Sequence, residues 1–121
     1  MWLFKAESPI EVIRNFLYIK SVQNTGIGFG LWQGHNALVI WLTIIFLGVI
    51  IYYLNEIVEN KNIAVLAGLL IGGAVGNLMD RIFMGFVRDF IAFTFWPAFN
   101  VADAAITIGG IGLIILFLKK K

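Results

Sequence analysis

Three aspartates of this chain lie near the ends of apolar segments, where carboxyl groups could do acid–base chemistry. Only 13% of the 121 residues are charged, so the position of each acid is informative. Asp80 directly follows the second apolar segment, Asp89 lies beyond it, and Asp103 is near the start of the last one. Polar residues that can support a carboxylate occur in the same stretches, namely Asn77, Arg81 and Asn100. This pattern predicts a cluster of acids and amides at one surface of the protein.

Two carboxyl groups that lie close together share one proton, because they cannot both ionise readily. The ionised member can take a proton from water, and the protonated member can polarise a peptide carbonyl or protonate the leaving nitrogen. The chain has no cysteine, and its single histidine is far from the cluster in sequence, so carboxylates are the available acid–base groups. This is the chemistry of an aspartic protease. A simpler interpretation is that Asp103 caps its helix or pairs with Arg81 or Arg88.

Composition places these residues in a membrane protein. Hydrophobic residues make up 60% of the chain and its mean hydropathy is +0.92, whereas soluble domains average about 45–50% apolar residues. The absence of cysteine excludes disulfides and thiolate metal sites, and one histidine argues against a histidine-based zinc site. A net charge of +2 gives no reason to expect nucleic-acid binding. We therefore expect one membrane-embedded domain over residues 1–121, with no metal and no cofactor.

Three apolar runs must position the aspartates, at residues 37–54, 63–79 and 101–118. Their length is at the lower limit for a helix that crosses a bilayer. Their continuous hydrophobicity differs from the alternation of a membrane β-barrel strand. The runs therefore predict three transmembrane helices. The second run is rich in glycine and alanine, and because small residues let helices pack closely in lipid, we expect this packing to occur within the chain.

The segments 1–36 and 80–100 are too polar to span the membrane and, with three spans, lie on the same side of it. They contain two stretches rich in aromatic and β-branched residues, QNTGIGFGLW (23–32) and VRDFIAFTFW (87–96), which could pair as strands. The lysines at 119–121 favour a cytoplasmic C-terminus. The predicted fold class is an α-helical integral membrane protein with three transmembrane helices and a small β-rich interfacial element on its outer face.

Four sequence blocks resemble the signature of a known family. They are QNTGIGFG (23–30), GGAVGNLMDR (72–81), FVRDFI (86–91) and PAFNVADAAI (97–106). Their order and spacing are similar to those of the lipoprotein signal peptidases of bacteria, also called type II signal peptidases. One block alone, such as the glycine run, would be weak evidence, but the four together are specific and cover most of the chain.

This resemblance implies a function and a role for individual residues. The family comprises membrane aspartic endopeptidases that remove the signal peptide from diacylglyceryl-modified prolipoproteins, cutting before the lipidated cysteine with an aspartate dyad that activates water. Asp89 and Asp103 match the dyad. Supporting and substrate-binding positions are matched by Asn24, Asn77, Asp80, Arg81 and Asn100. The implied partners are the prolipoprotein and membrane lipids, and the implied location is the bacterial cytoplasmic (inner) membrane, with the active site on the outer, periplasmic face.

One difference from the family pattern leaves alternatives open. The family has four spanning helices, the first of which usually carries a D-x-x-x-K pattern, whereas Lys5 of this chain follows no apolar span. We expect a natural short form, or a truncated or redesigned one. A catalytically impaired homologue that binds lipidated substrate without cutting it is one alternative function. A small helical channel or transporter subunit that uses Asp103 as an ion site is another, and the sequence leaves the oligomeric state open.

Overall fold

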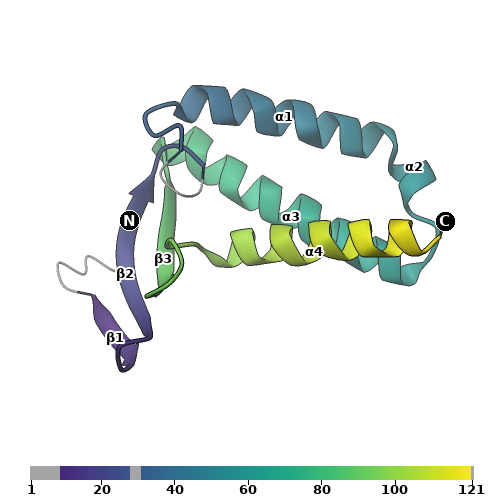
Figure 1. Cartoon of the computed structure of the whole chain (residues 1–121). Coiled ribbons are helices and arrows are strands. Elements are labelled where there is room, and N and C mark those ends of the chain that lie inside the picture. Colours follow the sequence, from purple (N-terminus) through teal and green to yellow (C-terminus); the bar gives the residue numbers. More distant parts are fainter. Residues whose placement is uncertain (1–8, 28–30, 121) are drawn as a thin grey trace.

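A computed structural model of the chain describes residues 9–27 and 31–120, so the expectations for residues 1–8 and for 28–30 of the first signature block lie outside the described residues. A small sheet lies at one end of a group of helices (Figure 1). Its strands are β1 (Ile10–Ile13), β2 (Leu17–Asn24) and β3 (Val87–Phe93). The helices are α1 (Asn36–Tyr52), α2 (Leu54–Ile57), α3 (Lys61–Met84) and α4 (Val101–Lys119). The sheet adjoins one end of α1, α3 and α4, whereas α2 and the C-terminus lie at the other end.

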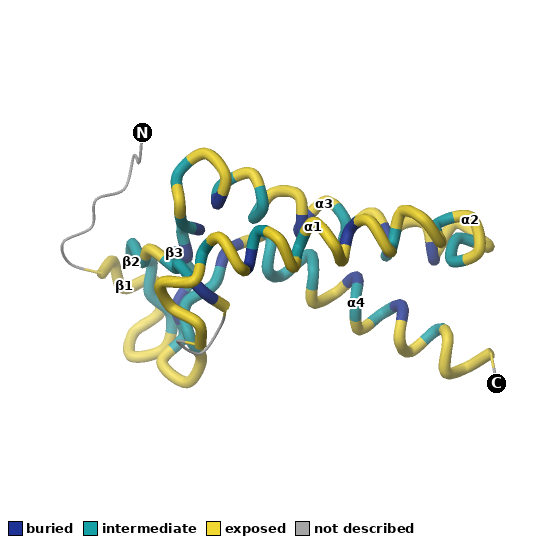
Figure 2. Tube along the Cα trace, turned by 90° about the horizontal axis from the view of Figure 1, so that it is seen from above, coloured by how far each residue is buried: buried dark blue, intermediate teal, exposed yellow. Residues whose placement is uncertain are grey.

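The long helices expose apolar side chains to their surroundings. Among the described residues, α3 and α4 are long and apolar enough to cross a membrane, and α1 is an apolar helix of 17 residues. Only 28% of the most apolar window of α3 and 11% of that of α4 is buried within the chain. Figure 2 shows the same property as long exposed stretches along α1 and α4. Helices with so much exposed apolar surface need lipid around them rather than water.

The ends of α3 are set by a side-chain cap and a glycine. The side chain of Asn60 accepts a hydrogen bond from the N–H of Ile63 at 3.0 Å. Gly85 adopts a left-handed conformation with φ of 84°, and its N–H donates to the carbonyl of Arg81. The helix therefore continues beyond the predicted run 63–79, and residues 80–84 are helical instead of belonging to the loop. Because β3 begins at Val87, the end of α3 and the start of this strand are adjacent.

The contact between α3 and α4 depends on close approach of their backbones. A Cβ atom on Gly73 would lie 2.5 Å from the carbonyl oxygen of Ala102, and one on Gly109 would lie 2.5 Å from that of Leu66. The same two helices enclose the buried hydrophobic cluster, which consists of Ile63, Ala67, Leu70 and Leu113. Packing of the small residues within the chain was predicted from the sequence and is confirmed.

The three strands form an antiparallel sheet in the order β1-β2-β3. In the β2–β3 pair, Asn24 lies opposite Val87 and Val22 lies opposite Asp89. A register irregularity on the Ile19 side of Val22 breaks the ladder next to Asp89, and such irregularities bend and twist a strand. The expected β-rich element is present, but β2 takes the place of the expected strand 23–32 and ends at Asn24, because the backbone bends at residues 25–27.

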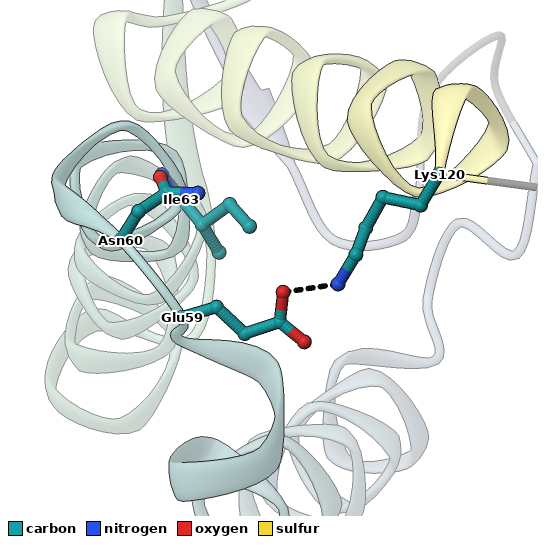
Figure 3. Close-up of polar contacts among 4 residues, drawn as sticks. All are labelled: Glu59, Asn60, Ile63 and Lys120. Atoms are coloured by element: carbon teal, nitrogen blue, oxygen red, sulfur yellow. Dashed lines mark hydrogen bonds and ion pairs between the residues drawn. The ribbon is translucent and has the colours of Figure 1, made fainter.

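At the end of the helices opposite the sheet, one ion pair joins α4 to the loop before α3. The ammonium group of Lys120 contacts the carboxylate of Glu59, next to the Asn60 cap of α3 (Figure 3). Both side chains are about half exposed. Exposed pairs of this kind typically contribute about 0–1 kcal/mol. The glycine-mediated contact is therefore the main cause of the α3–α4 arrangement.

Candidate active site

Asp89 and Asp103 come together where β3 meets the beginning of α4. Asp89 lies on the same face of β3 as Val87, because side chains alternate along a strand, and these residues are only 3% and 1% exposed. Asp103 lies in the first turn of α4. Backbone hydrogen bonds between Ile91 and Phe99 bring the segment before α4 alongside β3. The two aspartates, 14 positions apart in sequence, are thereby placed at one site.

Asp103 has two structural partners, one for each carboxylate oxygen. Its Oδ2 accepts the backbone N–H of Asn100 at 3.1 Å, while the side chain of Asn100 accepts the N–H of Asp103 at 2.9 Å. This reciprocal arrangement is a capping box, so the simpler interpretation that Asp103 caps its helix is confirmed. The other oxygen, Oδ1, accepts a hydrogen bond from Asn77 Nδ2 at 2.8 Å. The cap fixes the position of the carboxylate without preventing it from lining a cavity.

Asn100 connects both aspartates in one hydrogen-bond network. Its Nδ2 donates to Asp89 Oδ1 at 3.1 Å and to Asn77 Oδ1 at 3.0 Å. The other oxygen of Asp89, Oδ2, accepts from Asn24 Nδ2 at 3.0 Å. Each oxygen of each aspartate therefore accepts one N–H donor, which stabilises the ionised form of the carboxyl group. Within the described part of the chain, the network orients both carboxyl groups without an ion pair to either of them.

Burial raises the pKa of Asp89 from its ordinary value of 3.8 to about 6. The hydrogen bond from Asn24 acts in the opposite direction, the negative charge of Asp103 raises the pKa further, and Arg81 and Asn100 lower it. The proton of Asp89 is thus exchangeable near neutral pH, whereas an ordinary aspartate is fully ionised there. A carboxyl group with such a pKa is suited to acid–base catalysis.

Arg81 connects the site to the beginning of α1. Its side chain is only 6% exposed, and Nη1 donates to Asn36 Oδ1 at 3.1 Å while Nη2 donates to the carbonyl of Gly26. Asn36 returns a hydrogen bond from Nδ2 to the backbone carbonyl of Arg81 at 3.2 Å. The pairing of Asp103 with Arg81 that the sequence allowed is replaced by these contacts. Arg81 therefore joins α3, α1 and the loop after β2.

Most of the residues singled out from the sequence meet at this site. The structure brings together Asn24, Asn77, Arg81, Asp89, Asn100 and Asp103. Asp80 lies on the neighbouring face of α3, is partly exposed and is not among the described residues that line the cavity. Sequence reasoning missed Asn36 and Gln33. Asn36 could have been found as the last polar residue before the first apolar run, whereas Gln33 has no distinguishing signal.

A cavity of about 480 Å³ opens beside the network and continues between the helices. Its polar lining near the sheet consists of Asn24, Asn77, Arg81, Asp89 and Asp103. Farther from the sheet, α1 contributes Leu42 and Phe46, α3 contributes Ala74, and α4 contributes Ile106. The cavity therefore joins two carboxyl groups to an apolar groove, so it could place a polar bond at the aspartates and an apolar group between the helices.

Comparison with known proteins identifies relatives over nearly the whole chain. A family described as Signal peptidase (SPase) II matches residues 1–119. A lipoprotein signal peptidase of Halothermothrix orenii is 37% identical over 117 residues, covering 97% of this chain and 80% of the relative. A lipoprotein signal peptidase of Syntrophomonas wolfei is 41% identical over 120 residues, with the same coverage of 97% and 80%.

Two solved structures have the same fold. A bacterial membrane enzyme determined by the in meso method at 2.3 Å superposes with a TM-score of 0.83 and 39% identity, covering 93% of this chain and 71% of that one. A second, determined by the same method at 1.9 Å, gives a TM-score of 0.80 and 38% identity, covering 96% and 77%. At this level of identity the two proteins resemble this chain in sequence as well as in fold.

Proposed function

Because this chain belongs to the signal peptidase II family, whose members are aspartic-type proteases of bacterial membranes, we propose that it cuts diacylglyceryl-modified prolipoproteins immediately before the lipidated cysteine. Asp89 and Asp103 form the catalytic pair in this proposal. Removal of signal peptides from prolipoproteins is the activity that family membership supports. The cleavage position and the catalytic pair are the further steps argued below.

The observation that supports the catalytic pair best is that both aspartates line one cavity while their oxygens accept amide hydrogen bonds. Asp89 accepts hydrogen bonds from the side chains of Asn24 and Asn100. Asp103 accepts them from the side chain of Asn77 and from the backbone N–H of Asn100. Four donors fix the orientations of two carboxyl groups that have no ion-pair partner among the described residues. Asp89 has a raised pKa and both carboxyl groups line a cavity, a combination that is typical of residues that take part in acid–base chemistry.

The proposed reaction uses one proton shared by the two aspartates. The ionised carboxylate takes a proton from a water molecule as its oxygen attacks the carbonyl carbon of the scissile peptide bond. The protonated carboxyl, which we assign to Asp89 because burial raises its pKa, donates its proton to the leaving nitrogen. The C–N bond breaks, and the products are the carboxylate of the signal peptide and the amino group of the lipidated cysteine.

Arg81 and the amides of Asn24, Asn77 and Asn100 orient the reacting groups. We retain for Asp80 the supporting role that its match to the family pattern implies.

The apolar groove suits a substrate that lies in the membrane. Leu42 and Phe46 on one side and Ile106 on the other can contact a signal helix or an acyl chain. Such a substrate reaches the aspartates laterally from the bilayer without crossing water. The groove therefore explains why a lipid-modified precursor is the expected substrate.

We place α1, α3 and α4 across the bilayer in a single membrane-embedded domain. The sheet, and with it the catalytic pair, then lies at the outer, periplasmic face, together with the described residues that precede α1 and those between α3 and α4. The opposite end, which includes α2, Lys119 and Lys120, lies at the cytoplasmic face, where basic residues are favoured.

The test of this function is a cleavage assay with purified protein in nanodiscs. We expect a diacylglyceryl-modified prolipoprotein to be converted to a shorter form, and mass spectrometry to place the new N-terminus at the lipidated cysteine. The same precursor with serine in place of that cysteine cannot be lipidated and is expected to remain uncut. Binding of the precursor without cleavage by a folded protein would contradict the proposal and support a binding homologue instead.

The pH dependence of cleavage follows from the shared proton. Activity requires the singly protonated pair, so kcat/KM is expected to fall as pH rises through the pKa of Asp89, near 6 in the free enzyme. Bound substrate excludes water from the cavity and raises this pKa further. The decrease of kcat at high pH, the basic limb of its pH profile, is therefore expected at higher pH than the corresponding decrease of kcat/KM. Rates measured across a pH series at several substrate concentrations separate the two limbs. A kcat/KM that stays constant between pH 5 and 8 would contradict the shared-proton scheme.

A further inference from the structure

Asp89 accepts hydrogen bonds from the side-chain amides of Asn24 and Asn100, and an amide can present either its nitrogen or its oxygen to a partner. In the structure Nδ2 of Asn24 faces Asp89 Oδ2 at 3.0 Å. A flipped amide would place Oδ1 against the carboxylate, where two acceptors would repel each other. What fixes the direction of this amide therefore affects the ionisation of Asp89.

Two donors on the other side of Asn24 fix its direction. Its Oδ1 accepts the backbone N–H of Gly26 at 2.9 Å and Nε2 of Gln33 at 2.8 Å. A backbone N–H can only donate, so it selects the oxygen of Asn24. Gln33 adds the second donor from the far end of the loop, just before α1 begins at Asn36. With both donors present, only the nitrogen of Asn24 remains for Asp89.

The orientation of Gln33 is itself fixed by Thr25. Gln33 Oε1 accepts from the N–H and from the hydroxyl of Thr25, both at 3.1 Å. The hydroxyl oxygen of Thr25 in turn accepts the N–H of Gly34 at 2.8 Å. Because backbone N–H groups anchor this chain of hydrogen bonds, its polarity is determined from Thr25 to Asp89. The nitrogen of Gln33 therefore faces Asn24, as its role requires.

We propose that Gln33 is a positioning residue, which fixes the Asn24 amide so that its nitrogen donates to Asp89. This inference rests on the proposed function of Asp89. Gln33 is exposed and does not line the cavity, so it acts through Asn24 and not through contact with substrate. Neither the composition of the loop nor its spacing indicates this role.

The consequence is a change in the proton affinity of Asp89. Among the described residues, the charged groups that act on this carboxyl are Asp103 from α4 and Arg81 from α3, and neither changes when methionine replaces Gln33. Glutamate at this position adds a negative charge, so Gln33→Met is the variant whose pKa shift reports the loss of the directed amide. Loss of the directed amide weakens a hydrogen bond to the ionised form of Asp89, so its pKa rises. The basic limb of kcat/KM then moves to higher pH, by about half a unit to one unit if one hydrogen bond is lost.

The experiment compares Gln33→Met and Gln33→Glu with the parent. Methionine has a similar length and no donor, and glutamate can still accept from Thr25 but offers no donor to Asn24. For both we expect kcat on the acidic, pH-independent plateau to fall roughly 3-fold to 10-fold, KM to change little, and the basic limb of the pH profile to move to higher pH. Gln23→Met is the matched control, because Gln23 is an exposed residue of β2 that does not line the cavity, and it is expected to behave like the parent.

A double-mutant cycle separates positioning from a general structural role. In an Asn24→Ala background, Gln33→Met is expected to have no further effect on kcat or on the basic limb of the pH profile, because the described contacts connect Gln33 to Asp89 through Asn24. Equal effects of Gln33→Met in both backgrounds, or an unmoved limb in active Gln33 variants, would overturn the proposal. Isotope-edited infrared titration of the Asp89 carboxyl, assigned with Asp89→Asn, should show the same pKa rise. Because this readout needs no turnover, it also decides the role of Gln33 in the event that the parent does not cleave prolipoprotein.

Discussion

Asp89→Asn and Asp103→Asn are each expected to lower prolipoprotein cleavage by at least about 10³-fold, with substrate binding retained. The exchange preserves shape but removes the carboxyl group that must gain or lose a proton. Since the two aspartates share one proton, either loss removes both functions of the pair. We therefore expect the double variant to be little worse than the single ones. Initial rates from gel-shift assays at several protein concentrations would measure these differences.

The controls must show that the variants lose the catalytic step and keep their fold and their binding of substrate. In either variant one amide N–H donor of the network would face the new NH₂ group, so thermal unfolding should be compared with that of the parent. Glu56→Gln makes the same acid-to-amide change in α2, at the other end of the molecule, and is expected to cleave normally. Crosslinking of lipidated precursor to the folded variants reports binding. An Asp103→Asn variant that is folded and cleaves within a few-fold of the parent would rule out the dyad.

The second large effect concerns the packing of α3 against α4, which brings Asn77 and Asp103 together. Gly73→Ala is expected to destabilise the fold by about 1–3 kcal/mol, because the new Cβ would lie 2.5 Å from the backbone oxygen of Ala102 and 2.8 Å from Cγ1 of Ile106. Relief of this overlap requires α3 and α4 to separate. Asn77 and Asp103 lie on these two helices, so their 2.8 Å hydrogen bond should lengthen and cleavage should decrease.

Gly72 supplies a matched control in the adjacent position of the same helix. A Cβ there would meet nothing within 4 Å, and alanine is the better helix former by up to about 1 kcal/mol. Gly72→Ala is therefore expected to be neutral or stabilising, opposite in sign to Gly73→Ala. Thermal unfolding of both variants in the same detergent gives the comparison. Equal unfolding temperatures would show that α3 and α4 are not in close contact in the membrane protein.

Several features of the fold could be read from short stretches of sequence. Continuous apolar runs indicated the positions of α1, α3 and α4, because hydrophobicity over about 18 residues is a local property. The predicted ends were less accurate where a charged residue is buried. Arg81 was expected to lie outside the helix, but its contacts with Asn36 and Gly26 compensate its burial and allow α3 to continue to Met84.

The sequence by itself indicated a membrane protein, and its motifs indicated membership of the signal peptidase II family, in which Asp89 and Asp103 match the aspartates of the family pattern. The types of these residues and their spacing can be recognised in short sequence motifs. Only the tertiary structure decided how each carboxyl is oriented, because the donors come from distant segments: Asn24 reaches Asp89 across 65 positions, and Asn77 reaches Asp103 across 26. It likewise decided the place of Gln33, whose amide matters only through its contact with Asn24. Hydrogen-bond direction depends on which groups meet in space, and no local pattern of hydrophobicity or charge encodes it.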